Sequence, residues 1–112
     1  RLTRFFEEHC HPDEEIRLIR DGSAYMDIRD ANDEWIRLRL SPGVHIVLPA
    51  GIYHRFTLDT MNYLRAIRMF KHIGPWTSFN RCPSTDRSPH RLTYLERYGR
   101  DTFDMSAHLS MM

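Results

Sequence analysis

The chain has 112 residues, a length that fits one domain with a modest hydrophobic core. Its 16 Lys and Arg against 15 Asp and Glu leave a net charge of +1, without the long basic run that nucleic-acid binding favours. No stretch of about 18 apolar residues is present to insert into a membrane. Two cysteines, Cys10 and Cys82, are too few for a disulfide framework, and they indicate a reducing compartment.

Alternation of apolar and polar residues dominates the first two thirds of the chain and predicts a series of short strands. The predicted strands are residues 3–11, 15–20, 23–29, 34–40, 44–48, 53–58 and 63–71. Turn signals rich in Pro, Gly, Asp and Asn separate them. Short strands at this spacing favour a mainly all-β fold, a small antiparallel β-barrel or jelly roll.

The pattern changes after residue 74, where residues 75–89 are predicted to form a loop. Leu92, Leu95 and Tyr98 follow at helical spacing and predict a short C-terminal helix over residues 90–98. We therefore expect one domain at residues 1–98 and a flexible tail at residues 99–112. Because residues 1–6 are already strand-like, we also expect the chain to begin inside the domain.

A first motif, H-x-H-x3-E-x6-G, is formed by His9, His11, Glu15 and Gly22. Residues two apart in a strand point to the same face, so the two imidazoles project together while Cys10 points away and packs on the opposite side. Glu15 then opens the next strand beside them. Glu7 shares the face of His9 and is the one credible substitute for this carboxylate, although the spacing favours Glu15.

A second motif, G-x5-P-x-G-x2-H, ends at His54, directly after a predicted turn at residues 49–51. Together the two motifs offer three imidazoles and one carboxylate, a donor set suited to Fe(II), Ni(II), Mn(II) or Zn(II). An octahedral ion held by these four ligands would keep two open positions for a chelating substrate. The other histidines are interpreted as packing or surface residues: His45, His72, His90 and His108.

Two arginines lie on the predicted inward faces near these ligands. Arg17 follows Glu15 by two residues, and a buried guanidinium must be paired. The functional interpretation is that Arg17 binds an anionic, oxygen-rich substrate, and the alternative is a structural ion pair or a surface position. The same alternatives apply to Arg68, while Phe56 shares the face of His54.

Longer segments around the motifs form a more specific pattern, of which LPAGIYHRFTL at residues 48–58 is the most distinctive part. Further matching segments are residues 5–11, 14–17, 21–23, 27–30, 35–37, 62–63, 66–70 and 76–81. On these residues the chain resembles a cupin, and more closely the acireductone dioxygenase family of the eukaryotic type. The resemblance covers about residues 1–98.

The resemblance implies an oxidoreductase of methionine salvage that oxidises the acireductone 1,2-dihydroxy-3-keto-5-methylthiopentene with O2. With Fe(II) the family forms 4-methylthio-2-oxobutanoate and formate, and with Ni(II) it forms methylthiopropionate, formate and carbon monoxide. By family position the metal ligands are His9, His11, Glu15 and His54. By the same resemblance the catalytic positions are Arg17 and Arg68, and the substrate-pocket positions are Phe5 and Phe56.

The chain also departs from the family pattern, since the family's N-terminal segment is absent and Leu58 replaces the Asn of the general cupin motif. Two alternatives to the dioxygenase are therefore considered, another metal cupin enzyme such as an isomerase, or an inactive interaction module. We expect the small acireductone and O2 as partners, with no nucleic acid and no membrane insertion. We further expect a monomer in the cytoplasm, with the nucleus as a second compartment.

Overall fold

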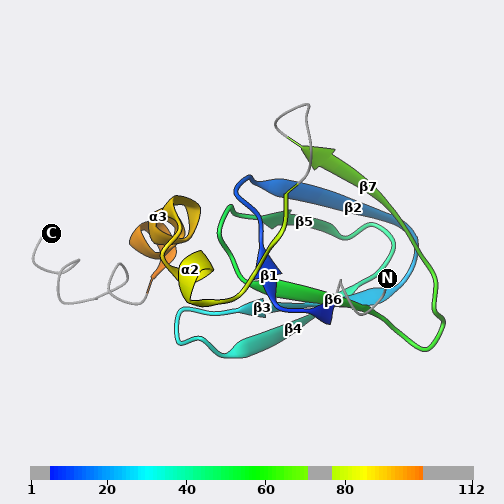
Figure 1. The fold of residues 1–112 in the computed structure, drawn as a ribbon. Helices are drawn as coiled ribbons and strands as arrows, with labels where there is room; N and C mark the ends of the chain where they lie inside the picture. The colour runs from blue at the N-terminus through cyan, green and yellow to red at the C-terminus, as the bar shows by residue number, and fades with distance from the viewer. Residues whose placement is uncertain (1–5, 71–76, 100–112) are drawn as a thin grey trace, which may run out of the picture.

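Two antiparallel sheets face each other in the computed structural model, which describes residues 6–70 and 77–99 (Figure 1). One sheet has five strands in the order β4-β3-β6-β1-β8, and the other has three in the order β5-β2-β7. The strands are β1 (His9–Cys10), β2 (Glu15–Gly22), β3 (Ala24–Arg29), β4 (Trp35–Leu40), β5 (His45–Leu48), β6 (His54–Leu58), β7 (Leu64–Phe70) and β8 (Phe79–Asn80). The helices are α2 (Pro83–Asp86) and α3 (Pro89–Tyr98). The predicted jelly roll with a short C-terminal helix is confirmed.

The hydrophobic core consists of buried side chains from both sheets and from the turn before β6: Ile19, Met26, Leu40, Leu48 and Ile52. Along β2 the buried residues alternate with partly exposed ones, as expected for a strand with one inward face. That inward face carries Glu15 and Arg17 before it reaches Ile19. The interior between the sheets is therefore polar at the start of β2 and apolar further along it.

Two glycines of the motifs, Gly22 and Gly51, lie where a side chain would not fit. Gly22 has φ +79°, and a Cβ there would lie 2.2 Å from the carbonyl oxygen of Tyr63. Gly51 has φ +82°, and a Cβ there would lie 2.4 Å from the carbonyl oxygen of His90. Both positions combine a left-handed backbone with a close approach, which explains the requirement for glycine.

The predicted strand at residues 3–11 is wrong in its described part, because β1 contains only His9 and Cys10. Phe6 is helical and Glu7 lies in a bend, while residues 3–5 lie outside the described residues. Two ion pairs hold the side chain of Glu8, at 2.8 Å from Arg29 and 2.8 Å from Arg81. These contacts and the two-residue partner strand β8 limit the ladder that β1 can form.

The predicted loop at residues 75–89 is also wrong in part, since its described residues contain β8 and α2. Phe79 pairs with Cys10, a partner that no local pattern indicates. Pro83 begins α2, where the fixed φ of proline suits the first helical turn. Residues 100–112, most of the predicted tail, lie outside the described residues, so the domain limits stay a prediction.

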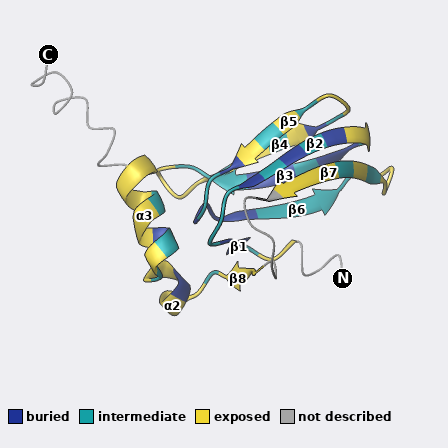
Figure 2. Cartoon of the chain, turned by 90° about the horizontal axis from the view of Figure 1, so that it is seen from above, coloured by how far each residue is buried: buried dark blue, intermediate teal, exposed yellow. Residues whose placement is uncertain are grey.

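Helix α3 confirms the predicted C-terminal helix. Leu92, Leu95 and Tyr98 are exposed, whereas Arg91 is buried. Figure 2 shows that much of α3 is coloured as exposed. Within residues 6–70 and 77–99, no helix is long and apolar enough to cross a membrane.

Candidate metal centre

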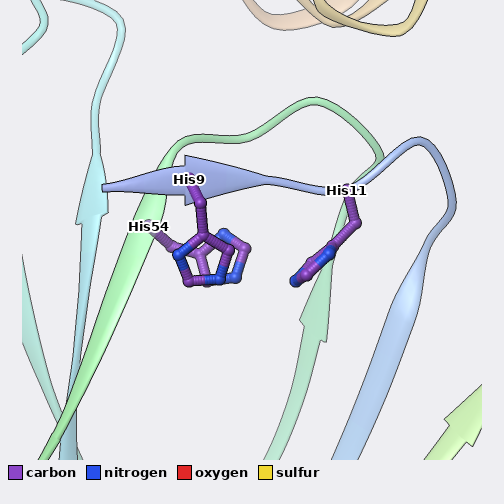
Figure 3. Close-up of side chains that lie close together, drawn as sticks. All are labelled: His9, His11 and His54. Carbon is purple, nitrogen blue, oxygen red and sulfur yellow. The ribbon is translucent and has the colours of Figure 1, made fainter. Parts of the chain in front are cut away.

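Three buried histidines meet at one end of the space between the sheets (Figure 3). His9 lies in β1 opposite His54, the first residue of β6, and His11 follows one residue after β1. One ring nitrogen from each of the three lies within 4.8 Å of the other two. In the part of the chain that the structure describes, this is the one cluster of at least three such donors.

Backbone carbonyls hold the Nδ1 atom of each imidazole. His9 Nδ1 lies 2.6 Å from the carbonyl of Glu7, and His11 Nδ1 lies 2.8 Å from that of Thr77. His54 Nδ1 lies 3.0 Å from the carbonyl of Ile52. A carbonyl can only accept, so each neutral ring carries its proton on Nδ1 and presents an unprotonated Nε2. Histidine ligands of metals are oriented by the same type of contact.

Among the described residues, Nε2 of His54 is a buried side-chain atom without a hydrogen-bond partner. The other two buried atoms without a hydrogen bond, Oε2 of Glu15 and Nε of Arg17, face each other at 2.8 Å as an ion pair. A buried polar atom without a partner is costly, and an ion at the site is a common explanation. The lone pair of His54 Nε2 is the clearest indication that these residues fit a metal.

Burial keeps the three imidazoles neutral over a wide pH range. Desolvation lowers the pKa of His9, and it lowers the pKa of His11 to about 4. The pKa of His54 is well below its ordinary value, mainly because this side chain is buried. Neutral imidazole is the form that binds metal, so the cluster has the protonation state needed to bind a cation near neutral pH.

We expect the metal-free chain to lose stability as the pH falls from about 6.5 towards about 4. In this window the unfolded chain protonates its histidines while the buried ones stay neutral, so the unfolded state binds more protons. Thermal melting of chelator-treated protein between pH 7.5 and pH 4 measures the effect. His11→Gln should make the melting temperature depend less on pH. An equal change of melting temperature with pH in this variant and in the parent would contradict the lowered pKa of His11.

Glu15 is completely buried at the start of β2 and interacts with two arginines. Its Oε2 lies 2.8 Å from Nε of Arg17, and its Oε1 lies 2.8 Å from Nη2 of Arg68. Burial alone would raise the pKa of this carboxyl, but the two guanidinium groups outweigh burial and lower it. Glu15 is thus an ionised carboxylate beside the histidines, although it is not part of the 4.8 Å cluster. Its role as a fourth ligand stays a prediction.

A hollow of about 420 Å³ opens beside this carboxylate. Arg17, Arg68 and Phe56 line it, with the guanidinium carbon of Arg17 lying 5.6 Å from the centroid of the Phe56 ring. The remaining lining residues are Leu58, Asn62, Tyr63, Leu64 and Ala66. Three of the predicted catalytic and substrate-pocket residues therefore share one hollow, while Phe5 lies outside the described residues.

The residues interpreted as non-ligands lie away from the cluster where they are described. Cys10 is buried as a free thiol and is not part of the donor group, and His45 is exposed. His90 contacts the ring of Phe79, with 5.2 Å between the centroids. Glu7, the alternative carboxylate, accepts a hydrogen bond from Asn80 at the surface. His72 and His108 lie outside the described residues.

Sequence reasoning missed the carbonyl of Thr77, which orients His11 from 66 residues away. Local spacing carries no signal for such a contact.

A family model described as the ARD/ARD' family matches residues 1–78 of the chain. The chain belongs to the ARD/ARD' family. An acireductone dioxygenase from Emericella nidulans is 53% identical over 96 residues, which cover 86% of this chain and 54% of that protein. This chain thus spans about half the length of the curated ARD/ARD' relatives that it matches.

Solved structures support the same family and fold. An acireductone dioxygenase from Bacillus anthracis, solved with a cadmium ion in its active centre, is 35% identical with a TM-score of 0.60. That match covers 62% of this chain and 40% of the other. Oxalate decarboxylase from Bacillus subtilis has a TM-score of 0.57 at 18% identity, over 81% of this chain and 24% of the other, which shows the fold alone. The cupin fold expected for an ARD/ARD' member is confirmed.

Proposed function

We propose that this chain is the metal-binding cupin region of an acireductone dioxygenase of methionine salvage. It would oxidise 1,2-dihydroxy-3-keto-5-methylthiopentene with O2, giving 4-methylthio-2-oxobutanoate and formate in the iron form. In the nickel form the products would be methylthiopropionate, formate and carbon monoxide. Membership of the ARD/ARD' family and the names of its relatives support this reaction.

The observation that carries the proposal is the buried cluster of His9, His11 and His54, which presents three unprotonated Nε2 atoms within reach of one ion. Imidazole suits both iron and nickel, and the ionised Glu15 is available as an oxygen donor. A divalent iron or nickel ion held here would supply a Lewis acid with open positions for a chelating substrate.

The hollow lined by Arg17 and Arg68 offers polar and apolar contacts that would suit the two ends of the acireductone. Arg17 and Arg68 place guanidinium donors on the side of Glu15, where they would stabilise the negative charge of the substrate's enediol oxygens. Leu64 and Ala66 offer apolar surface along the same hollow for the methylthio chain.

The test is O2 consumption by the chain after anaerobic loading with Fe(II), with the acireductone as substrate. Uptake of O2 with formation of formate and the keto acid is expected. Metal binding without O2 uptake would favour another metal cupin enzyme. A chain that binds no metal would favour the interaction module.

We expect the metal to decide the products of this reaction. The nickel-loaded chain should release carbon monoxide together with formate, and the iron-loaded chain should release the keto acid and formate without carbon monoxide. Headspace gas analysis of the two reconstituted forms, with a metal-free sample as the control, measures this difference. Carbon monoxide from the iron form alone would contradict the proposal.

We further propose a monomer that works in the cytoplasm, with the nucleus as a second compartment. The free thiols of Cys10 and Cys82 support a reducing environment. Size-exclusion chromatography with light scattering tests the monomer.

A further inference from the structure

Helix α3 buries a charged residue and exposes both of its leucines. Arg91 is 8% exposed, whereas Leu92 is 53% exposed and Leu95 is 41% exposed. Burying a guanidinium is costly unless it makes specific interactions. Tyr94 of the same helix packs against the hydrophobic core, but the burial of Arg91 needs an explanation of its own.

Arg91 makes its contacts with the turn that leads into β6. Its Nη1 donates a buried hydrogen bond of 2.9 Å to the carbonyl of Gly51. Its guanidinium carbon lies 4.2 Å from the ring centroid of Tyr53 and 5.1 Å from that of Tyr94. Among residues 6–70 and 77–99, no carboxylate lies within 4.0 Å of this guanidinium. Arg91 thus interacts with one carbonyl oxygen and with two aromatic rings.

The turn that Arg91 holds is connected to two of the histidines. The backbone N–H of Gly51 donates a hydrogen bond of 2.9 Å to the carbonyl of His11. Tyr53 is fully buried, directly precedes His54, and donates a hydrogen bond of 2.5 Å to Asp86 of α2. The left-handed φ of Gly51 lets the first turn of α3 approach this backbone closely.

We propose that Arg91 is a positioning residue of the metal centre, which fixes the turn at residues 49–53 and thereby sets the places of His11 and His54. It touches neither metal nor substrate and acts only through Gly51 and Tyr53. The inference rests on the metal site of the proposed function, and it extends that site to a helix beyond the residues 1–78 of the family match.

Arg91→Met tests the proposal, because it keeps an unbranched side chain of similar length but removes the donors. The dissociation constant for Co(II) is measured on the full chain by chelator competition, together with the visible absorption spectrum of the Co(II) form. We expect the affinity to fall by about tenfold, as loss of outer partners of metal ligands typically does, with an altered spectrum. Arg91→Lys should restore part of the affinity, since lysine keeps the positive charge and N–H donors.

Arg97→Met is the matched control, because Arg97 lies on the same helix but is exposed. It should leave the Co(II) affinity and spectrum unchanged. If Arg91→Met lowers the melting temperature while the folded protein keeps the parental affinity and spectrum, Arg91 is merely structural and the proposal is overturned. If Arg91→Met fails to fold, the same measurements are made on Arg91→Lys. Parental Co(II) affinity and an unchanged spectrum in Arg91→Lys would then overturn the proposal. A parent chain that binds no Co(II) would instead contradict the proposed function itself.

Discussion

His54→Ala is expected to reduce the metal content of the purified chain from about one divalent ion to nearly none. The variant removes an Nε2 atom that is buried and has no partner among the described residues. Loss of a direct donor should exceed the roughly tenfold to hundredfold effect of losing an outer partner. His11→Ala should act in the same way, because its ring belongs to the same cluster. Metal analysis by mass spectrometry after gel filtration measures both variants.

Two histidines provide the controls for this experiment. His45 is exposed on β5, and His90 lies in α3 against Phe79. His45→Ala and His90→Ala should therefore keep the parental metal content. Parental metal content in both His11→Ala and His54→Ala would refute the site. Melting temperatures of the metal-free variants distinguish loss of a ligand from loss of the fold.

The sequence predicted the histidine cluster because the direction of each imidazole within its own strand depends on local geometry. Period-two spacing places His9 and His11 on one face, and the strand that follows the Gly51 turn begins at His54. The cross-strand pairing of His9 with His54 then brings the two motifs together. Alternation of apolar and polar residues located the main strands for the same reason.

Contacts between distant segments were beyond this reasoning. Strand β8 exists because Phe79 and Asn80 pair with β1, and two residues carry no periodicity of their own. Arg91 of α3 is buried against the turn at Gly51, a contact that the spacing of the apolar residues does not indicate. Tertiary contacts of this type cannot be read from the local sequence pattern, although they help to hold the histidines in place.

Glu15 shows how a correct local prediction can still be incomplete. Its inward orientation on β2 was expected, and it is confirmed by complete burial. The pairing of Glu15 with both Arg17 and Arg68 depends on the β2–β7 register, which places the two arginines opposite each other. Sequence reasoning treated substrate binding and ion pairing as alternatives for these arginines, whereas the structure places the ion pairs at the edge of the hollow.

Arg17→Ala is expected to keep its metal but lose turnover by on the order of 100-fold or more. A guanidinium is not a metal ligand, and Arg68, which lies 2.8 Å from Oε1 of Glu15, should keep this ion pair when Arg17 is removed. The buried carboxylate therefore remains paired in the variant. The hollow, however, loses the donor that lies over Phe56, where the charge of the bound acireductone would be stabilised. Arg17→Lys should recover only part of the rate, because an ammonium lacks the planar set of donors.

The competing explanation is that Arg17 only balances the charge of Glu15, at 2.8 Å from its Oε2. Arg17→Ala would then lower the melting temperature, while turnover per bound metal stayed at the parental value. Arg20→Ala is the control, since Arg20 lies on the same strand but is exposed. Metal content, melting temperature and turnover per metal, measured on the same preparations, separate the two explanations. A normal rate per metal with a lowered melting temperature would assign Arg17 to stability alone, and a slow rate with full metal content would place it at the substrate.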